Sequence, residues 1–157
     1  MQRITTFLWF DKEAVEAAKF YCSIFKKSKL LGTTRNFEGV PGTTAEVLTV
    51  QFRLGDQEFV ALNGGPQFKF TEAISLMINC KDQKEVDYYW EKLLAGGGKE
   101  SACGWLKDKY GLSWQVTPTI LLEMIADKNR KKAQRAMDAM MQMVKLDIKK
   151  LKEAYDG

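Results

Sequence analysis

The chain has 157 residues, of which 45% are hydrophobic and 28% are charged. A chain of this length and composition buries enough apolar surface to fold as one globular domain over residues 1–157, so disorder is not expected. The net charge of +4 resides in the tail: positions 127–157 hold 9 Lys and Arg against 5 Asp and Glu, whereas positions 1–126 hold 15 of each. The basic cluster is short and no aromatic residue interleaves it, which argues against a nucleic-acid partner.

The cysteine pattern and the lengths of the apolar runs indicate the cellular compartment. Cys22, Cys80 and Cys103 are odd in number and widely spaced. This matches neither a disulfide framework nor a CxxC metal motif and predicts reduced thiols. The amino-terminal segment lacks the long apolar region of a signal peptide, and no apolar run approaches the roughly 20 residues of a membrane helix. We therefore expect a cytoplasmic protein with no membrane partner.

The first part of the chain predicts a helix among strands. Ile4–Phe10 is rich in β-branched and aromatic residues, which favours a strand. Asp11 is placed to cap a helix over Glu13–Phe25, where apolar residues recur at helical spacing. Further strands are expected, the last two joined by a tight turn at Gly55 and Asp56: Leu30–Phe37, Glu46–Leu54 and Glu58–Asn63.

The same order restarts in the second part. Ala73–Cys80 predicts a strand, Asp82 an N-cap, and Lys84–Ala95 a helix that three glycines end. Short strands are expected around Ser101–Lys107 and Leu112–Val116. The two parts align at an offset of 69 residues, for example position 4 with position 73. Any two strand–helix units align to some degree, but agreement at both strand and helix favours a duplication.

The last part of the chain predicts only helices. They are expected over Thr119–Ala126, over Asn129–Val144, and beyond a cap at Asp147. Met residues are concentrated in Met137–Met143. Such a stripe fits an adaptable binding surface, although core filling or a subunit contact is commoner. We expect these helices to pack on the sheet or on a partner subunit.

Several segments resemble one known family. The segments LNGGP (62–66) and CGWLKDKYGLSWQ (103–115) are the specific ones, supported by ITTFLWFDKEAVEAAKFYCSIF and the tail DIKKLKEAYDG. They are similar to the PhnB-like branch of the vicinal-oxygen-chelate superfamily, a branch often labelled 3-demethylubiquinone-9 3-methyltransferase-like. The superfamily includes glyoxalases and bleomycin-resistance proteins. The resemblance implies an α+β fold of tandem βαβββ modules, 1–65 and 70–118, with a helical extension over 119–157. It also implies a ligand cup formed by the two modules and a homodimer.

The resemblance also indicates where metal-dependent relatives hold their ion. Those positions fall on Thr6, on Asn63 or Ala61, on Ser75 and on Gln115. None is an anion or an imidazole, the donors that a divalent cation needs. The chain has no His, which excludes a 2-His-1-carboxylate site and a Ser–His–Asp triad. We therefore expect no catalytic metal and no cofactor.

The methyltransferase label is not supported by the first strand. Enzymes that use S-adenosylmethionine usually have a glycine-rich turn there. In this sequence Phe10 runs directly into Asp11 with no glycine, so the GxGxxG motif is absent. Methyl transfer is not expected.

Aromatic and amide side chains are the candidates for a ligand pocket. Apolar walls with a few fixed polar groups suit an aromatic or heterocyclic small molecule. Core packing is an equal alternative for Trp9 and Trp114, and a surface loop is the better interpretation of Gln67. The candidate pocket residues are Thr6, Trp9, Asn63, Gln67, Phe68, Phe70, Ser75, Trp105, Trp114 and Gln115.

Three functions remain open from the sequence. The first is a metal-free small-molecule-binding protein whose ligand the sequence does not identify. The second is an enzyme of the same superfamily, a lyase, isomerase or transferase, that uses a carboxylate such as Asp108 or Glu123 as a base or a metal bound by unexpected ligands. The third is a dimeric structural module in which the C-terminal helices make the main contact.

Overall fold

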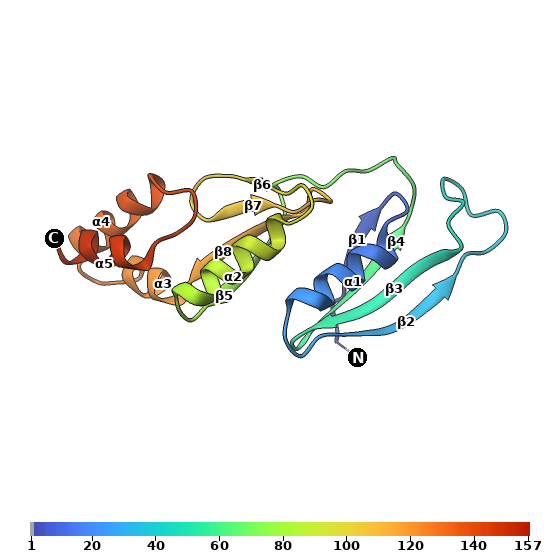
Figure 1. The fold of residues 1–157 in the computed structure, drawn as a ribbon, viewed down its shortest axis with the longest axis horizontal. Helices are drawn as coiled ribbons and strands as arrows, with labels where there is room; N and C mark the ends of the chain where they lie inside the picture. The colour runs from blue at the N-terminus through green and yellow to red at the C-terminus, as the bar shows by residue number, and fades with distance from the viewer. Residues whose placement is uncertain (1) are drawn as a thin grey trace. The chain divides into compact units, whose positions relative to one another are not determined.

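The computed structural model describes residues 2–157. The chain folds into two compact units, Met1–Phe70 and Thr71–Gly157. In the described residues each unit contains a four-stranded sheet with a helix packed on it (Figure 1). The predicted α+β class, with tandem βαβββ modules followed by C-terminal helices, is confirmed.

The first unit is built on a mixed sheet in the strand order β1-β4-β3-β2. Strand β1 pairs in parallel with β4, and the remaining neighbours are antiparallel. Alanines on α1 bring the helix close to the sheet, where Tyr21 stacks on Phe52 at 6.1 Å between ring centroids. The elements are β1 (Thr6–Phe10), α1 (Ala14–Ile24), β2 (Lys29–Arg35), β3 (Val47–Leu54) and β4 (Gln57–Asn63).

Helix α1 is capped from the sheet and not from its own segment, which corrects the predicted cap at Asp11. Glu13 precedes the helix, and its side chain makes no capping bond. Asn63, at the end of β4, accepts a hydrogen bond from the Ala14 amide at 2.8 Å and donates one to the Val47 carbonyl at 2.8 Å. A strand end thus satisfies a backbone donor that a local cap would otherwise satisfy.

The second unit repeats this order, with the strand order β5-β8-β7-β6. Asp82 caps α2 as predicted, since its carboxylate accepts the Glu85 amide at 2.9 Å. The strand expected over Ser101–Lys107 is wrong in extent, because the chain turns at Cys103 and Gly104, both at positive φ. The elements are β5 (Ser75–Cys80), α2 (Gln83–Leu94), β6 (Lys99–Glu100), β7 (Trp105–Lys107) and β8 (Ser113–Pro118).

The C-terminal helices belong to the second unit. They are α3 (Thr119–Ile125), α4 (Arg130–Met141) and α5 (Ile148–Asp156). Asn129 caps α4 and Asp147 caps α5. The segment after α4 accepts hydrogen bonds from the Cys103 and Gly104 amides, which joins the helices to the β6–β7 turn. No helix in residues 2–157 is long and apolar enough to span a membrane. The helices share a small core of Leu121, Met124, Ala136, Leu146 and Leu151.

Candidate functional site

The face of the second sheet opposite α2 carries three of the predicted pocket residues. Trp105 and Gln115 are direct partners across β7 and β8. The Gln115 amide donates a hydrogen bond to the Ser75 hydroxyl on β5 at 2.8 Å. Trp105, Gln115 and Ser75 are each partly exposed. The structure therefore brings these three side chains together on one accessible surface.

A small pocket of about 220 Å³ lies among β6, β7 and the start of β8. Trp105, Lys107 and Ser113 line it, with Glu72 from the segment before β5. The Lys107 ammonium lies 2.5 Å from a Glu72 carboxylate oxygen, and this hydrogen bond holds the pKa of Glu72 below its ordinary value. The pocket thus combines an aromatic ring, an ion pair and a hydroxyl.

Ser113 is the unusual member of this pocket. The residue is 1% exposed, and its Oγ has no hydrogen-bond partner among the described residues. A buried polar atom without a partner costs about 1–3 kcal/mol, so such atoms are rare unless something else satisfies them. Ser113 is not among the predicted pocket residues, although its position two residues before Gln115 places it on the same face of β8.

In the first unit the predicted aromatic residues gather around the LNGGP segment. The Trp9 indole donates a hydrogen bond to the Gly65 carbonyl at 2.9 Å, and Phe68 meets the Trp9 ring edge-on at 4.9 Å. A Cβ at Gly64 would lie 2.3 Å from the Trp9 ring, so glycine is required there. Phe68 is 64% exposed. The motif thus holds an aromatic pair with an accessible edge.

Gln67 and Phe70 flank Phe68 in the sequence. Gln67 is exposed, and a Cβ at Gly42 would lie 2.5 Å from its amide nitrogen. This close approach ties the loop of Gly42 to the LNGGP segment. Phe70 meets Phe10 edge-on at 5.3 Å, so it extends the core of the first unit.

Three other predicted residues have places in the scaffold. Thr6 pairs with Phe59, which is 6% exposed, on the face that α1 covers. Asn63 is 2% exposed and uses its amide to hold Ala14 and Val47. Trp114 is 3% exposed in the core beside α2 and donates its indole hydrogen bond to Asp108 at 2.9 Å.

Asp108 and Glu123 differ in their freedom to act as a base. Asp108 is 3% exposed and accepts hydrogen bonds from the Tyr110 and Leu112 amides and from the Trp114 indole. These bonds fix the turn before β8 and hold the carboxylate in place. Glu123 is exposed on α3, away from the pocket of Ser113.

The residues predicted to occupy the metal positions of metal-dependent relatives do not fit a divalent cation. Gln115 and Ser75 are uncharged and are hydrogen-bonded to each other. Within residues 2–157, no cluster of three or more His, Cys, Asp or Glu side chains is close enough to share an ion. Cys80 offers no thiolate, because burial raises its pKa to about 12. No step of a metal-dependent reaction can be derived for this chain.

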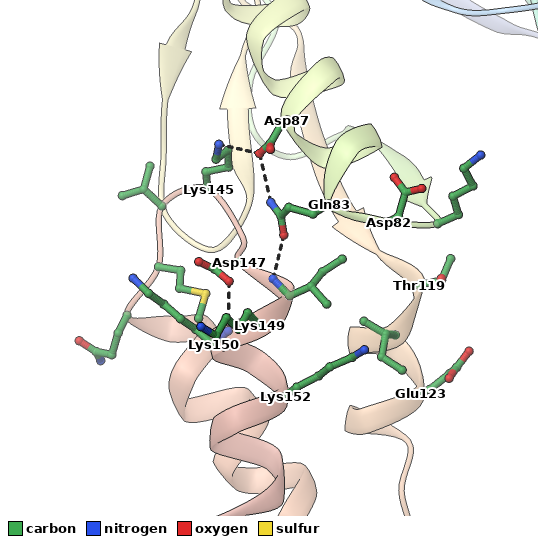
Figure 2. Close-up of a pocket in the computed structure, with 16 residues that line it drawn as sticks. Asp82, Gln83, Asp87, Thr119, Glu123, Lys145, Asp147, Lys149, Lys150 and Lys152 are labelled. Atoms are coloured by element: carbon green, nitrogen blue, oxygen red, sulfur yellow. Dashed lines mark hydrogen bonds and ion pairs between the residues drawn. The ribbon is translucent and has the colours of Figure 1, made fainter.

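A larger groove, which the sequence did not predict, lies between α2, α3 and α5 (Figure 2). Its volume is about 1110 Å³, and lysines from the tail contribute much of its lining. The feature of the sequence that could have indicated this groove is the excess of positive charge after residue 126. The fold was needed to show that part of this charge faces a cavity.

Comparison with known proteins indicates relatives of the modules. Residues 2–117 match the family described as 3-demethylubiquinone-9 3-methyltransferase. The PhnB protein from Bacillus cereus is 37% identical, with a TM-score of 0.67, and the match covers 74% of this chain and 99% of that chain. No curated protein matches the chain.

More distant solved structures show a similar fold. A protein from Pseudomonas aeruginosa has 16% identity and a TM-score of 0.62, with 75% of this chain and 98% of that chain covered. The fosfomycin resistance protein FosX from Listeria monocytogenes has 15% identity and a TM-score of 0.51, with 75% and 93% covered. The family match ends at residue 117, before α3 begins at Thr119.

Proposed function

Since the chain belongs to the family described as 3-demethylubiquinone-9 3-methyltransferase, in the PhnB-like branch of the vicinal-oxygen-chelate superfamily, we propose that it is a metal-free small-molecule-binding protein. The ligand occupies the pocket of Trp105, Lys107 and Ser113 on the second sheet. The observation that carries this proposal is the buried Ser113 hydroxyl, which has no partner among the described residues. A ligand acceptor beside it would remove the cost of leaving this donor unsatisfied.

The chemistry of the pocket narrows the class of ligand. The Trp105 ring offers a face for a planar aromatic or heterocyclic group. The Ser113 hydroxyl and the Lys107 ammonium donate hydrogen bonds, which suits a carbonyl, phenolate or carboxylate oxygen. The volume of about 220 Å³ lies below the usual range for drug-sized ligands, about 300–1,000 Å³. A single substituted ring is the expected size.

Ser75 and Gln115 extend this surface along the sheet. Their mutual hydrogen bond leaves the Gln115 carbonyl and the Ser75 hydroxyl hydrogen as further neutral groups for a ligand. In the first unit, the Trp9–Phe68 pair remains a proposed ligand contact because Phe68 exposes most of its ring. Binding without turnover is favoured over catalysis, since the Asp108 carboxylate is buried and is already hydrogen-bonded to the Tyr110 and Leu112 amides and the Trp114 indole.

A thermal-shift screen of single-ring aromatic carboxylates and phenols, followed by calorimetry, tests the proposal. We expect at least one compound to stabilise the protein and to bind with about 1:1 stoichiometry. Ser113→Ala should weaken binding about tenfold by removing a donor, without destabilising the free protein. Ser23→Ala is the matched control, because this exposed hydroxyl bonds only its own helix at the Phe20 carbonyl. Equal affinity in both variants would refute the role of Ser113.

We also propose that the protein acts as a cytoplasmic homodimer. The free thiols of Cys22, Cys80 and Cys103 support a reducing compartment. Phe7 and Met77, which are 60% and 45% exposed on strands, support contact with a second copy. Light scattering coupled to size exclusion would measure the mass in solution. A chain ending at Ala126 would then show whether the C-terminal helices make the contact, as the alternative of a dimeric structural module requires.

A further inference from the structure

The groove between α2, α3 and α5 is a second cavity with its own chemistry. It lies in the second unit, and its walls carry Lys81, Lys145, Lys149, Lys150 and Lys152. Figure 2 shows Lys152 extending from α5 toward α3, and Lys149 and Lys150 beside Asp147 at the start of α5. The lysines therefore enter the cavity from different segments of the chain.

Three of the four carboxylates that line the groove are engaged within the fold, and the fourth, Glu123 on α3, is exposed. Asp82 caps α2 through the Glu85 amide, and Asp147 caps α5 through the Lys150 amide at 3.1 Å. Asp87 accepts a hydrogen bond from the Lys145 ammonium at 2.6 Å, which holds the pKa of Asp87 below its ordinary value. Two of these acids therefore serve as helix caps and the third pairs with Lys145, and among the described residues none of the three forms an ion pair with Lys150 or Lys152.

Two lysines remain without a carboxylate partner. In the part of the chain that the structure describes, neither Lys150 nor Lys152 forms an ion pair. Lys149 meets Glu153 only at 3.9 Å with both side chains largely exposed, an arrangement that contributes little. Lys149, Lys150 and Lys152 lie on the short helix α5, and their like charges repel each other. An anion bound between these lysines and the opposite wall of the groove would therefore be stabilising. The N-termini of α2 and α5 are already capped, so the lysine side chains would make the contacts there.

The groove walls are fixed to each other by Gln83. Its amide oxygen accepts the Ile148 amide at 2.9 Å, and its amide nitrogen donates to the Leu146 carbonyl at 3.1 Å. These bonds hold the start of α5 against α2 (Figure 2). The cavity is therefore a built feature, and one wall comes from the segment after residue 117, where the family match ends.

We propose that this groove is an anion site for a small molecule that carries two or more phosphate groups. Lysine binds phosphate as a point charge without demanding one geometry, which suits a cavity lined by flexible side chains. The lining contains no aromatic ring on which a nucleobase would stack. The apolar side chains of Ile120, Val144 and Ile148 in the lining accommodate a carbon skeleton next to the phosphates. The site is independent of the pocket on the second sheet.

Calorimetry of the full chain with pyrophosphate at low ionic strength tests this inference, with orthophosphate as the single-anion comparison. Pyrophosphate should bind, and orthophosphate should bind at least tenfold more weakly. The double substitution Lys150→Gln and Lys152→Gln should lower pyrophosphate affinity by about tenfold or more. Lys128→Gln with Lys131→Gln is the matched control, since it removes the same charge from exposed tail positions outside the groove.

The outcomes separate a built site from general attraction to a basic tail. Equal loss of affinity in both double variants would overturn the proposal, and so would equal affinity for the two phosphates. An absence of pyrophosphate binding at low salt would also overturn it. Thermal unfolding of each variant shows that the fold is intact. The alanine variant of Ser113 should bind pyrophosphate as the unmodified protein does, which keeps this result separate from the function proposed for the sheet pocket.

Discussion

Replacing Asn63 by Ala tests whether this residue is part of the scaffold or of a ligand site. The side chain is 2% exposed, accepts the Ala14 amide at 2.8 Å and donates to the Val47 carbonyl at 2.8 Å. Ala14 is fully buried, so water cannot replace the lost acceptor. Loss of a helix cap costs about 0.5–2 kcal/mol, and each buried polar group left without a hydrogen bond costs about 1–3 kcal/mol. Allowing for overlap between these contributions, Asn63→Ala should lower the free energy of unfolding by roughly 3 kcal/mol.

Urea unfolding monitored by circular dichroism measures this loss. Asn79→Ala is the matched control, because Asn79 is an exposed amide on β5. It should change the free energy of unfolding by less than about 0.5 kcal/mol. Ligands of the sheet pocket should bind Asn63→Ala with unchanged affinity at temperatures where it is folded. If Asn63→Ala is as stable as Asn79→Ala, the assignment of Asn63 as a cap and tether is incorrect.

Three further predictions concern a close contact, an ion pair and a thiol. Gly64→Ala would place a Cβ 2.3 Å from the Trp9 ring; it should destabilise the protein by about 1–3 kcal/mol and shift the Trp9 indole N–H resonance in NMR spectra. Lys145 lowers the pKa of Asp87 from its ordinary value of 3.8. The pair therefore stabilises the fold at pH values above 3.8, and this stabilisation is lost as the pH falls through the lowered pKa. Lys145→Met should remove this part of the acid dependence in urea titrations from about pH 2 to pH 7. Burial raises the pKa of Cys80 to about 12, so native Cys80 should resist iodoacetamide that labels it after unfolding, as mass spectrometry would show.

The sequence predicted best those features that depend on neighbouring residues. Asp82 and Asp147 cap helices as expected, since each cap acts on an amide three residues further along. Asn129, the first residue of a predicted helix, caps α4 in the same way. The cap at Asp11 was wrong because Asn63, 49 positions away from Ala14, takes that role. Periodicity within one segment contains no information about such a partner.

The assignment of side chains to sheet faces shows a second limit of prediction from the sequence. The 69-residue offset suits the helices, where Tyr21 and Trp90 are equivalent buried positions, 90 − 21 = 69. The strands align at 70, since Phe10 pairs with the last residue of β4 and Cys80 with the last residue of β8, 80 − 10 = 70. A shift of one residue moves a side chain to the opposite face of a strand. Thr6 therefore faces α1, whereas Ser75 lies on the face opposite α2.

The uncharged side chains on the second sheet determine which kind of ligand its surface can stabilise. A divalent cation would have to be held by carboxylates or imidazoles, yet the equivalent positions on β5 and β8 carry Ser75 and Gln115, which satisfy each other. The Lys107 ammonium nearby pairs with Glu72 and keeps further N–H groups for a ligand. Among the described residues that line this pocket, Ser113 is the one whose buried hydroxyl lacks a partner. In the function proposed above, a neutral donor beside an aromatic ring would select a ligand by an oriented hydrogen bond and by stacking, without a metal ion.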